Sequence, residues 1–375
     1  MGDSRPGADD YDGQHQTWRP DACAAGHGLK DPDDPTPTLT RRHMCGALVG
    51  GAMSLAAGTT LWGEGVPDEL ADKARAAKGF ERDSSGAHVV AIGIDGLRPD
   101  ALQIANTPNM DQLIGAGTIS YRSFAGGIPV VNPQVSSSAP GWSSILTGVW
   151  VDKHECESNA FLTPNYRDYP HFYQRILEQD PEAQLASFVN WEPINDIIIK
   201  GMRSDLADKV FTGRPWGRAG TVDRYELRDA QVGQMAAEFI AGADPKVMFL
   251  HFDAVDNAGH STAFAPDSPR YIQAIEAVDA ALGPVIEAVA ARNDRKKERW
   301  MFSMTTDHGG IGNGHGGQTI EERTIPFFVS GDGVDASVRL NGPGHCAMAP
   351  TVMTYLGLPI AEEWGWETDA FGLSS

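Results

Sequence analysis

Residues 88–97, HVVAIGIDGL, place a continuous apolar run directly before an aspartate and a glycine. An uninterrupted run of this kind is typical of a strand that is buried on both faces of a parallel sheet. Three later segments have the same character: VMFLHF at 247–252, WMFSMTT at 300–306 and IPFFV at 325–329. Amphipathic stretches alternate with these runs, so we expect an α/β fold with buried central strands.

Polar residues of the metal-binding type stand at or just beyond the ends of three of these strands. Asp95 follows the first strand, Asp253 the second, and the adjacent pair Asp307-His308 the third. In open α/β sheets, ligands bind outside the carboxyl ends of the strands. We therefore expect these side chains to contribute to one shared site.

Two helices can also be predicted from the pattern. Thr107-Pro108 has the form of a helix start that continues to about Ile114, because proline is favoured at the first helical position. Residues 271–292 show apolar side chains at helical spacing, with a bend or break expected near Gly283-Pro284. We expect this second helix to cover one face of the sheet.

The composition limits the classes of partner. The chain has 375 residues, 41% of them hydrophobic, and a formal net charge of −20. A protein so acidic is not expected to bind a nucleic-acid duplex or an anionic membrane surface, since both require a basic face. A small phosphorylated substrate remains compatible, because bound divalent cations would reverse the local field.

The first 80 residues differ from the rest. Residues 1–39 are rich in Asp, Gly and Pro and are predicted to be a disordered leader. The segment 40–77 resembles a twin-arginine export signal, with Arg41-Arg42 before a Gly/Ala-rich apolar run and a possible cleavage site at 74–76. A buried Gly/Ala helix is the alternative, and the protein would be cytoplasmic if the signal is misread. The run is too weakly apolar for a stable membrane span.

A single catalytic domain is expected over residues 86–375. The chain has four cysteines and no CxxC motif, so the sequence does not support a thiolate zinc site. If the leader is removed, Cys156 and Cys346 remain. A disulfide between them is a hypothesis that follows from their even number and from export.

The segment VSSSAPGWSSILTG at 135–148 contains a candidate nucleophile. Pro140 fits the first turn of a helix, which puts Ser138 at or next to the N-cap. There the helix dipole and free amide groups favour an alkoxide or a phosphate oxygen. Taken alone, the segment is better explained by a capping serine, since serine is among the favoured capping residues.

The other candidates are carboxylates and imidazoles. Asp256 and His260 are four residues apart, so in a helix they share one face. Asp307-His308 precedes two glycines that would let both side chains reach one site, and His315 follows in a Gly-rich loop. Carboxylate and imidazole together form a normal ligand shell for zinc.

Each of these signals is modest alone, but all lie at or just beyond strand ends. Such a set suits two cations about 3.5–4 Å apart, which together act on the attacking and leaving oxygens of an in-line displacement at phosphorus. The sequence therefore predicts a metal-dependent phosphoester hydrolase.

Several motifs in this order resemble the alkaline phosphatase superfamily, and most closely its type I phosphodiesterase/nucleotide pyrophosphatase branch. They are AIGIDGLRPDAL, TPNMDQLIGAGT, SAPGWSSILTGVWVDKH, DAVDNAGH, TTDHGG, GHGG before IPFFVSGDGV, and APTVMTYLGLP, spread over about residues 86–360. The resemblance implies a large, mostly parallel mixed sheet between helical layers.

The resemblance also implies a role for each matching residue. One metal would be held by Asp256, His260 and His315, and the other by Asp95, Ser138, Asp307 and His308. The implied metal is Zn²⁺. Ser138 would attack phosphorus and form a phospho-serine, which water then hydrolyses. His345 is an alternative to His315, which we prefer because it precedes the strand at 325–329.

The chain departs from the family pattern next to Ser138. Nucleotide pyrophosphatases usually carry an Asn where this chain has Gly141, and sulfatases an Arg where it has Trp142. Asn159 could supply an amide to the substrate instead. Trp191, Trp216 and Tyr225 could stack on an aromatic leaving group, although ordinary packing is the simpler role.

The first alternative function is a phosphomonoesterase or sulfatase of the same superfamily, and the second is a non-catalytic secreted binding protein. The sequence leaves open the choice between diesters and monoesters, the leaving group and the oligomeric state.

Overall fold

The computed structural model describes residues 86–217, 220–296, 298–334 and 336–373, all within one compact unit, Glu64–Ser375. The predictions for the leader at 1–39, the export signal at 40–77 and its cleavage site lie outside these residues. Among the described helices, none is sufficiently long and apolar to cross a bilayer.

The described chain is built on one eight-stranded sheet with the order β4-β3-β5-β1-β6-β7-β2-β8. The strands are β1 (Ala87–Ile94), β2 (Gly117–Phe124), β3 (Gln184–Val189), β4 (Val210–Gly213), β5 (Pro245–Phe252), β6 (Arg299–Thr305), β7 (Thr324–Gly331) and β8 (Ser337–Val338). Among the described strands, only β7 runs antiparallel to its neighbours, β6 and β2. The predicted mixed, mostly parallel sheet is therefore confirmed.

The four predicted strands are β1, β5, β6 and β7. Every residue of β1 and β5 is buried, which is why their sequences are apolar without alternation. β1 pairs in parallel with β5 on one side and β6 on the other. The three strands that precede Asp95, Asp253 and Asp307 are thus neighbours, and their carboxyl ends lie at one edge of the sheet.

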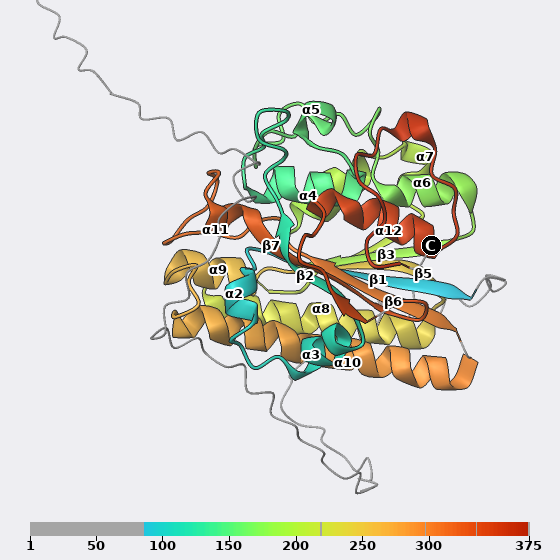
Figure 1. Cartoon of the computed structure of the whole chain (residues 1–375). Coiled ribbons are helices and arrows are strands. Elements are labelled where there is room, and N and C mark those ends of the chain that lie inside the picture. The colour runs from blue at the N-terminus through green and yellow to red at the C-terminus, as the bar shows by residue number, and fades with distance from the viewer. Residues whose placement is uncertain (1–85, 218–219, 297, 335, 374–375) are drawn as a thin grey trace, which may run out of the picture. The chain divides into compact units, whose positions relative to one another are not determined.

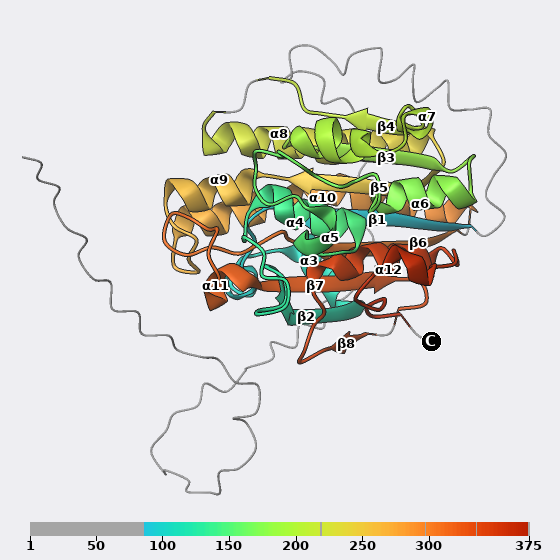
Figure 2. The ribbon, with the colours of Figure 1, turned by 90° about the horizontal axis from the view of Figure 1, so that it is seen from above.

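Helices cover both faces of this sheet (Figures 1 and 2). One face carries α3 (Pro108–Gly115), α8 (Val222–Gly242) and α10 (Pro269–Lys296), and the other α4 (Ser138–Thr147), α6 (Phe172–Gln179) and α12 (Met348–Tyr355). The other α-helices of the described residues are α2 (Pro99–Leu102), α5 (Val151–His154), α7 (Ser204–Ala207), α9 (Ala254–Ser261) and α11 (Ile320–Arg323). A separate hydrophobic core lies on each side of the sheet.

The predicted break in the second helix is wrong. α10 continues from Pro269 to Lys296 with Pro284 inside it. Proline removes one backbone hydrogen bond, but α10 packs along α8, and this contact is close. A Cβ on Gly233 of α8 would lie only 2.0 Å from the carbonyl oxygen of Ala281, so the helices meet backbone to backbone.

The hypothesis of a disulfide is also wrong, because Cys156 and Cys346 are both free and buried. The Cys156 thiol lies 3.9 Å from the carbonyl oxygen of Ser158, and the Cys346 thiol lies 3.7 Å from the Thr368 hydroxyl. Burial raises the pKa of the Cys346 thiol to about 12. Each thiol therefore occupies its own buried position.

Candidate functional site

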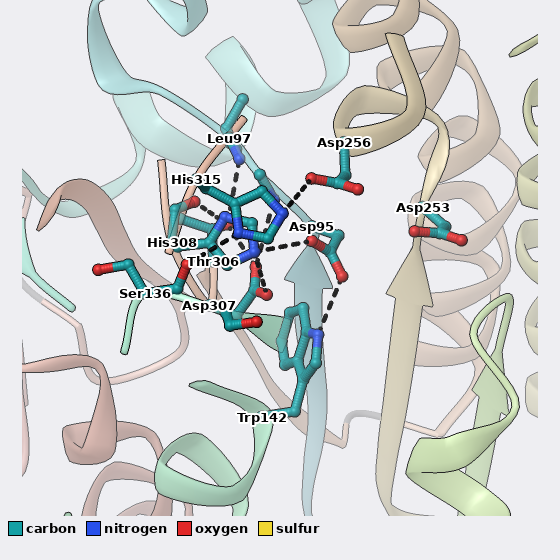
Figure 3. A network of polar contacts seen from close by, with 12 residues as sticks. Asp95, Leu97, Ser136, Trp142, Asp253, Asp256, Thr306, Asp307, His308 and His315 are labelled. Atoms are coloured by element: carbon teal, nitrogen blue, oxygen red, sulfur yellow. Dashed lines mark hydrogen bonds and ion pairs between the residues drawn. The ribbon is translucent and has the colours of Figure 1, made fainter. Parts of the chain in front are cut away.

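Asp95 is the central residue of the candidate site. It follows β1, and its Oδ2 accepts a hydrogen bond from the Trp142 indole at 3.1 Å and lies 3.3 Å from Nε2 of His251. Because Nδ1 of His251 accepts the backbone N–H of Trp191, Nε2 carries the proton and donates to Asp95. Oδ2 of Asp95 is thus fixed by two hydrogen bonds, from Trp142 and from His251, and Figure 3 shows the indole below Asp95.

The other oxygen of Asp95 faces the Asp307-His308 pair. His308 Nε2 lies 3.6 Å from Asp95 Oδ1 and 3.0 Å from Asp307 Oδ2. His308 Nδ1 donates to the carbonyl oxygen of Gly309, which fixes the ring and turns Nε2 toward the carboxylates. The backbone N–H of Gly96 donates to Asp307 Oδ1 at 3.2 Å. The irregular turn after β6 therefore lets adjacent residues reach one site, as predicted.

Asp256, His260 and His315 converge in the same way. Asp256 and His260 share one face of α9, with 3.4 Å between Asp256 Oδ2 and His260 Nε2. His315 Nε2 lies 3.5 Å from Asp256 Oδ1 and 3.0 Å from His260 Nε2. His315 Nδ1 donates to the carbonyl oxygen of Ser136, so Nε2 is the ring nitrogen that faces Asp256 and His260. The three side chains come from two segments 55 residues apart.

The two clusters are in direct contact. The rings of His308 and His315 stack with centroids 3.7 Å apart. Potential ligand atoms form two groups here, and within each group they lie no more than 4.8 Å apart. One group is Asp256, His308 and His315, and the other is Asp95, Asp307 and His308. Figure 3 shows Asp95, Asp256, Asp307, His308 and His315 pointing into a common region.

Ser138 is the first residue of α4 and is almost fully buried, with Ser137 as the N-cap. The first turn of α4 packs on the site, since a Cβ on Gly141 would lie 2.6 Å from the Asp307 Cβ. The Asn159 carbonyl oxygen accepts the backbone N–H of Ala139 at 2.8 Å. Asn159 therefore caps α4 beside Ser138 through its carbonyl oxygen, and its amide nitrogen takes no part in this bond.

Burial and the neighbouring charges shift the pKa values of the carboxylates and of His308 at this site. Burial and the charge of Asp95 raise the pKa of Asp256 and of Asp307. Burial opposes the charged form of Asp95 too, but the hydrogen bond from His251 and the charge of His308 hold its pKa below the usual value. Burial lowers the pKa of His308, but Asp307 and Asp95 outweigh this and raise it to about 10.

Two carboxylate oxygens here, Asp95 Oδ1 and Asp256 Oδ1, are buried without a hydrogen-bond partner, and imidazole nitrogens of His308 and His315 lie 3.6 and 3.5 Å from them. Asp307 Oδ2 and His308 Nε2 form an ion pair with each other at 3.0 Å and have no other partner. A buried polar atom left unpaired costs free energy, so Asp95 Oδ1 and Asp256 Oδ1 require a further partner. Oxygen and imidazole donors with excess negative charge suit divalent cations such as Zn²⁺.

Sequence reasoning missed the role of His251 and Trp142 in holding Asp95. The single imidazole inside the apolar run of β5 was the available signal for His251. Asp253 forms a third group of potential ligand atoms with Asp95 and His251. Its carboxyl is buried, which raises its pKa well above the ordinary value.

Other candidates have different positions. His345 is buried, with Nδ1 3.2 Å from the carbonyl oxygen of Thr306 and its ring stacked on Trp150, so it lies against β6 and not with Asp256. Trp191 pairs with Phe161 at 6.0 Å between ring centroids. Trp216 is exposed, and Tyr225 is half-buried near Asn257 of α9.

Comparison with known proteins identifies the family of this chain. The family model for type I phosphodiesterase/nucleotide pyrophosphatase matches residues 89–316. An uncharacterized pyrophosphatase/phosphodiesterase of Schizosaccharomyces pombe is 25% identical over 233 residues, which are 59% of this chain and 44% of that protein. This chain thus spans less than half the length of that relative.

Solved structures share the fold at low identity. A 2-O GAG sulfatase has a TM-score of 0.59 and 12% identity, with 76% of this chain and 73% of that chain covered. A phosphonate monoester hydrolase of Silicibacter pomeroyi has a TM-score of 0.51 and 15% identity, with 76% of each chain covered.

Proposed function

The chain belongs to the type I phosphodiesterase/nucleotide pyrophosphatase family, and from this membership we propose that it hydrolyses phosphate esters through a phospho-serine at Ser138. The observation that carries the proposal is the convergence of buried ligand-type atoms on Asp95, Asp256, Asp307 and His308, of which Asp95 Oδ1 and Asp256 Oδ1 have no hydrogen-bond partner. A purely structural cluster would have paired these two oxygens internally.

The residues fit two divalent cations, which we propose to be Zn²⁺. Asp256, His260 and His315 would hold one, and Asp95, Asp307 and His308 would hold the other together with Ser138. Bound cations at such sites neutralise charge on the phosphoryl oxygens and make a hydroxyl a better nucleophile. His251 and Trp142 orient Asp95, and the carbonyl oxygen of Ser136 orients His315.

The chemistry of the chain's own residues has two steps. The Ser138 hydroxyl gives its proton to solvent, and its oxygen forms a bond to phosphorus while the bond between phosphorus and the leaving-group oxygen breaks. Water then attacks the phospho-serine, the bond between phosphorus and the Ser138 oxygen breaks, and a proton from the attacking water restores the hydroxyl. The N-terminus of α4 places the positive end of the helix dipole beside Ser138, which favours this developing charge.

The test of the mechanism is a pair of neighbouring serine variants. Ser138→Ala should abolish turnover of bis-p-nitrophenyl phosphate, while Ser137→Ala, which removes a hydroxyl bonded to Asn159 Oδ1 at 3.3 Å but leaves the proposed nucleophile, should reduce it without abolishing it. Rapid acid quenching of the parent enzyme followed by peptide mass spectrometry should find phosphate on Ser138. Turnover that persists in Ser138→Ala would reject the covalent mechanism.

Asn159 is proposed to bind a non-bridging phosphoryl oxygen through its amide nitrogen, because its carbonyl oxygen is committed to the cap of α4. Asn159→Asp keeps the capping oxygen, removes the donor and adds a negative charge. We expect kcat/KM to fall by about 10²–10³, as for the loss of a donor to transition-state charge. A change of less than about threefold would remove Asn159 from the site.

A phosphomonoesterase or sulfatase is the alternative reading of the same site. The ratio of kcat/KM for bis-p-nitrophenyl phosphate to that for p-nitrophenyl phosphate separates the two phosphatase activities, and p-nitrophenyl sulfate tests the third. Trp142, at the position of the sulfatase arginine, is committed to Asp95. We therefore expect low activity on the sulfate.

Export is proposed on the twin-arginine pattern in residues 40–77. N-terminal sequencing of secreted protein should find a start close to residue 77. An intact leader on soluble, active protein would reject this prediction.

A further inference from the structure

The loop at residues 125–137, which joins β2 to α4, has an inverted surface pattern. Its apolar side chains face solvent: Val130 is 100% exposed and Val131 70%, and Ile128 and Val135 are also exposed. Polar side chains that alternate with them, at positions 132, 134 and 136, are buried. Soluble loops normally present the opposite pattern.

Hydrogen bonds hold the loop in this inverted state. Asn132 Oδ1 accepts the backbone N–H of Ile128 at 2.8 Å, and its amide donates to Asp152 at 3.0 Å. Gln134 Oε1 accepts from Ser144 and from the backbone of Val151. The apolar tip is therefore presented by a fixed scaffold.

Val130, at the tip, has φ of 63°. This left-handed conformation is unfavourable for a β-branched residue, and such strain persists only where the surrounding structure imposes it. Strained residues of this kind cluster at ligand-binding and functional segments.

A second exposed apolar segment lies against this loop. Ile320, the first residue of α11, is 74% exposed, and Ile311 is also exposed. The two segments are joined where the Ser136 hydroxyl donates to the carbonyl oxygen of Gly317 at 2.9 Å and His315 donates to Ser136. We name Ile128, Val130, Val131, Val135, Ile311 and Ile320 the apolar rim. Figure 2 shows α11 close to the loop between β2 and α4.

The apolar rim belongs to two stretches without charged residues. No Asp, Glu, Lys or Arg occurs between Arg122 and Asp152, or between Asp307 and Glu321, in a chain with 21% charged residues and a net charge of −20. Carboxylates lie beside the loop, since the Asn132 amide donates to Asp152 and Glu367. The exposed apolar side chains therefore suit a zwitterionic lipid surface and not an anionic one. Exposed apolar side chains on a rigid loop are suited to insertion at the headgroup boundary.

We propose that the apolar rim docks this protein on a zwitterionic phospholipid surface, which brings the site at Ser138 and His315 to phosphoesters held in that surface. The docking follows from the rim itself. The substrate class, an amphiphilic phosphoester, rests on the proposed function.

The test uses the full chain and vesicles of pure phosphatidylcholine in a flotation assay. The rim variant is Val130→Ser/Val131→Ser. The matched control is Ile104→Ser/Leu340→Ser, which removes side chains of similar exposure, 63% and 77%, outside the rim. The parent and control proteins should float with the vesicles, and the rim variant should partition at least about tenfold more weakly, as expected when two apolar side chains are lost from the lipid contact.

Soluble bis-p-nitrophenyl phosphate provides the independent readout, since all three proteins should hydrolyse it equally. Equal flotation of the rim variant and the parent, or no flotation of the parent, would overturn the docking proposal. Stronger binding to phosphatidylserine vesicles than to phosphatidylcholine would do the same. If flotation depends on the rim but the parent does not hydrolyse bis-p-nitrophenyl phosphate, the proposed function is rejected and the docking proposal is retained.

Discussion

Replacing Trp142 with Phe tests whether the indole positions the central carboxylate. Trp142 is fully buried and donates to Asp95 Oδ2 at 3.1 Å. The ring fits because position 93 in β1 is glycine, where a Cβ would lie 2.5 Å from the indole. Phenylalanine keeps the aromatic packing but cannot donate, so only His251 would still hold that oxygen.

The size of the expected effect follows from the negative charge of Asp95, which accepts the hydrogen bond from Trp142. Hydrogen bonds to charged groups contribute about 1.5–3 kcal/mol. Loss of a group that orients a metal ligand typically costs about 10–100-fold in metal affinity. We therefore expect the affinity for Zn²⁺ to fall by about that factor, with a comparable fall in turnover at limiting zinc and partial rescue by excess zinc.

Trp150 provides the matched control. It is fully buried too, but its indole nitrogen has no hydrogen-bond partner. Trp150→Phe therefore creates a similar cavity without removing a hydrogen bond, and both variants should lose similar stability from the smaller ring.

The assay is competition for Zn²⁺ with a chromogenic chelator, combined with urea unfolding of the metal-free proteins. Zinc affinity that is the same for Trp142→Phe and Trp150→Phe would refute the reasoning. It would mean that the indole only fills space next to Asp95.

Two further predictions concern the packing of α4 and a buried histidine. Gly141→Ala should reduce turnover at least about tenfold, because the new Cβ would lie 2.6 Å from the Asp307 Cβ and shift either Ser138 or Asp307. The control Gly283→Ala, whose Cβ would lie 3.5 Å from its nearest neighbour, should leave turnover unchanged. Equal effects of the two substitutions in steady-state kinetics would contradict this prediction. Burial lowers the pKa of His171 from 6.5 to about 4, so the unfolded chain binds the proton first and stability is lost as the pH falls below 6.5. At pH 5 the loss is about 2 kcal/mol from this residue. His171→Gln should therefore lose about that much less free energy of unfolding between pH 7 and pH 5 in urea titrations with chelator, and an unchanged pH dependence would count against it.

The sequence was sufficient for the features that depend on local pattern. The buried strands have apolar runs because both of their faces are covered, and a polar residue after such a run must lie at the sheet edge. This rule found Asp95 and the Asp307-His308 pair, while the four-residue spacing found Asp256 and His260, and all of them converge in the structure.

Features that depend on contacts between distant segments were not predicted. β7 has the same apolar character as β1, yet it is antiparallel, because direction depends on the connection and not on composition. The continuity of α10 through Pro284 depends on its packing against α8. His251 could not be assigned to Asp95, because the two residues are 156 positions apart.

The departure of this chain from its family at position 141 has a spatial explanation. A family asparagine at this place would require a side chain where Asp307 already lies, since even a Cβ on Gly141 would be 2.9 Å from the Asp307 carbonyl oxygen. The close approach of α4 to β6 therefore requires glycine. Asn159 reaches the same end of the helix from another segment and accepts the N–H of Ala139. Because the capping bond uses only the carbonyl oxygen, an amide donor remains beside Ser138. In this interpretation, the loss of an amide at position 141 and the presence of Asn159 are one structural change, and Asn159→Asp should reduce activity even though the cap is preserved.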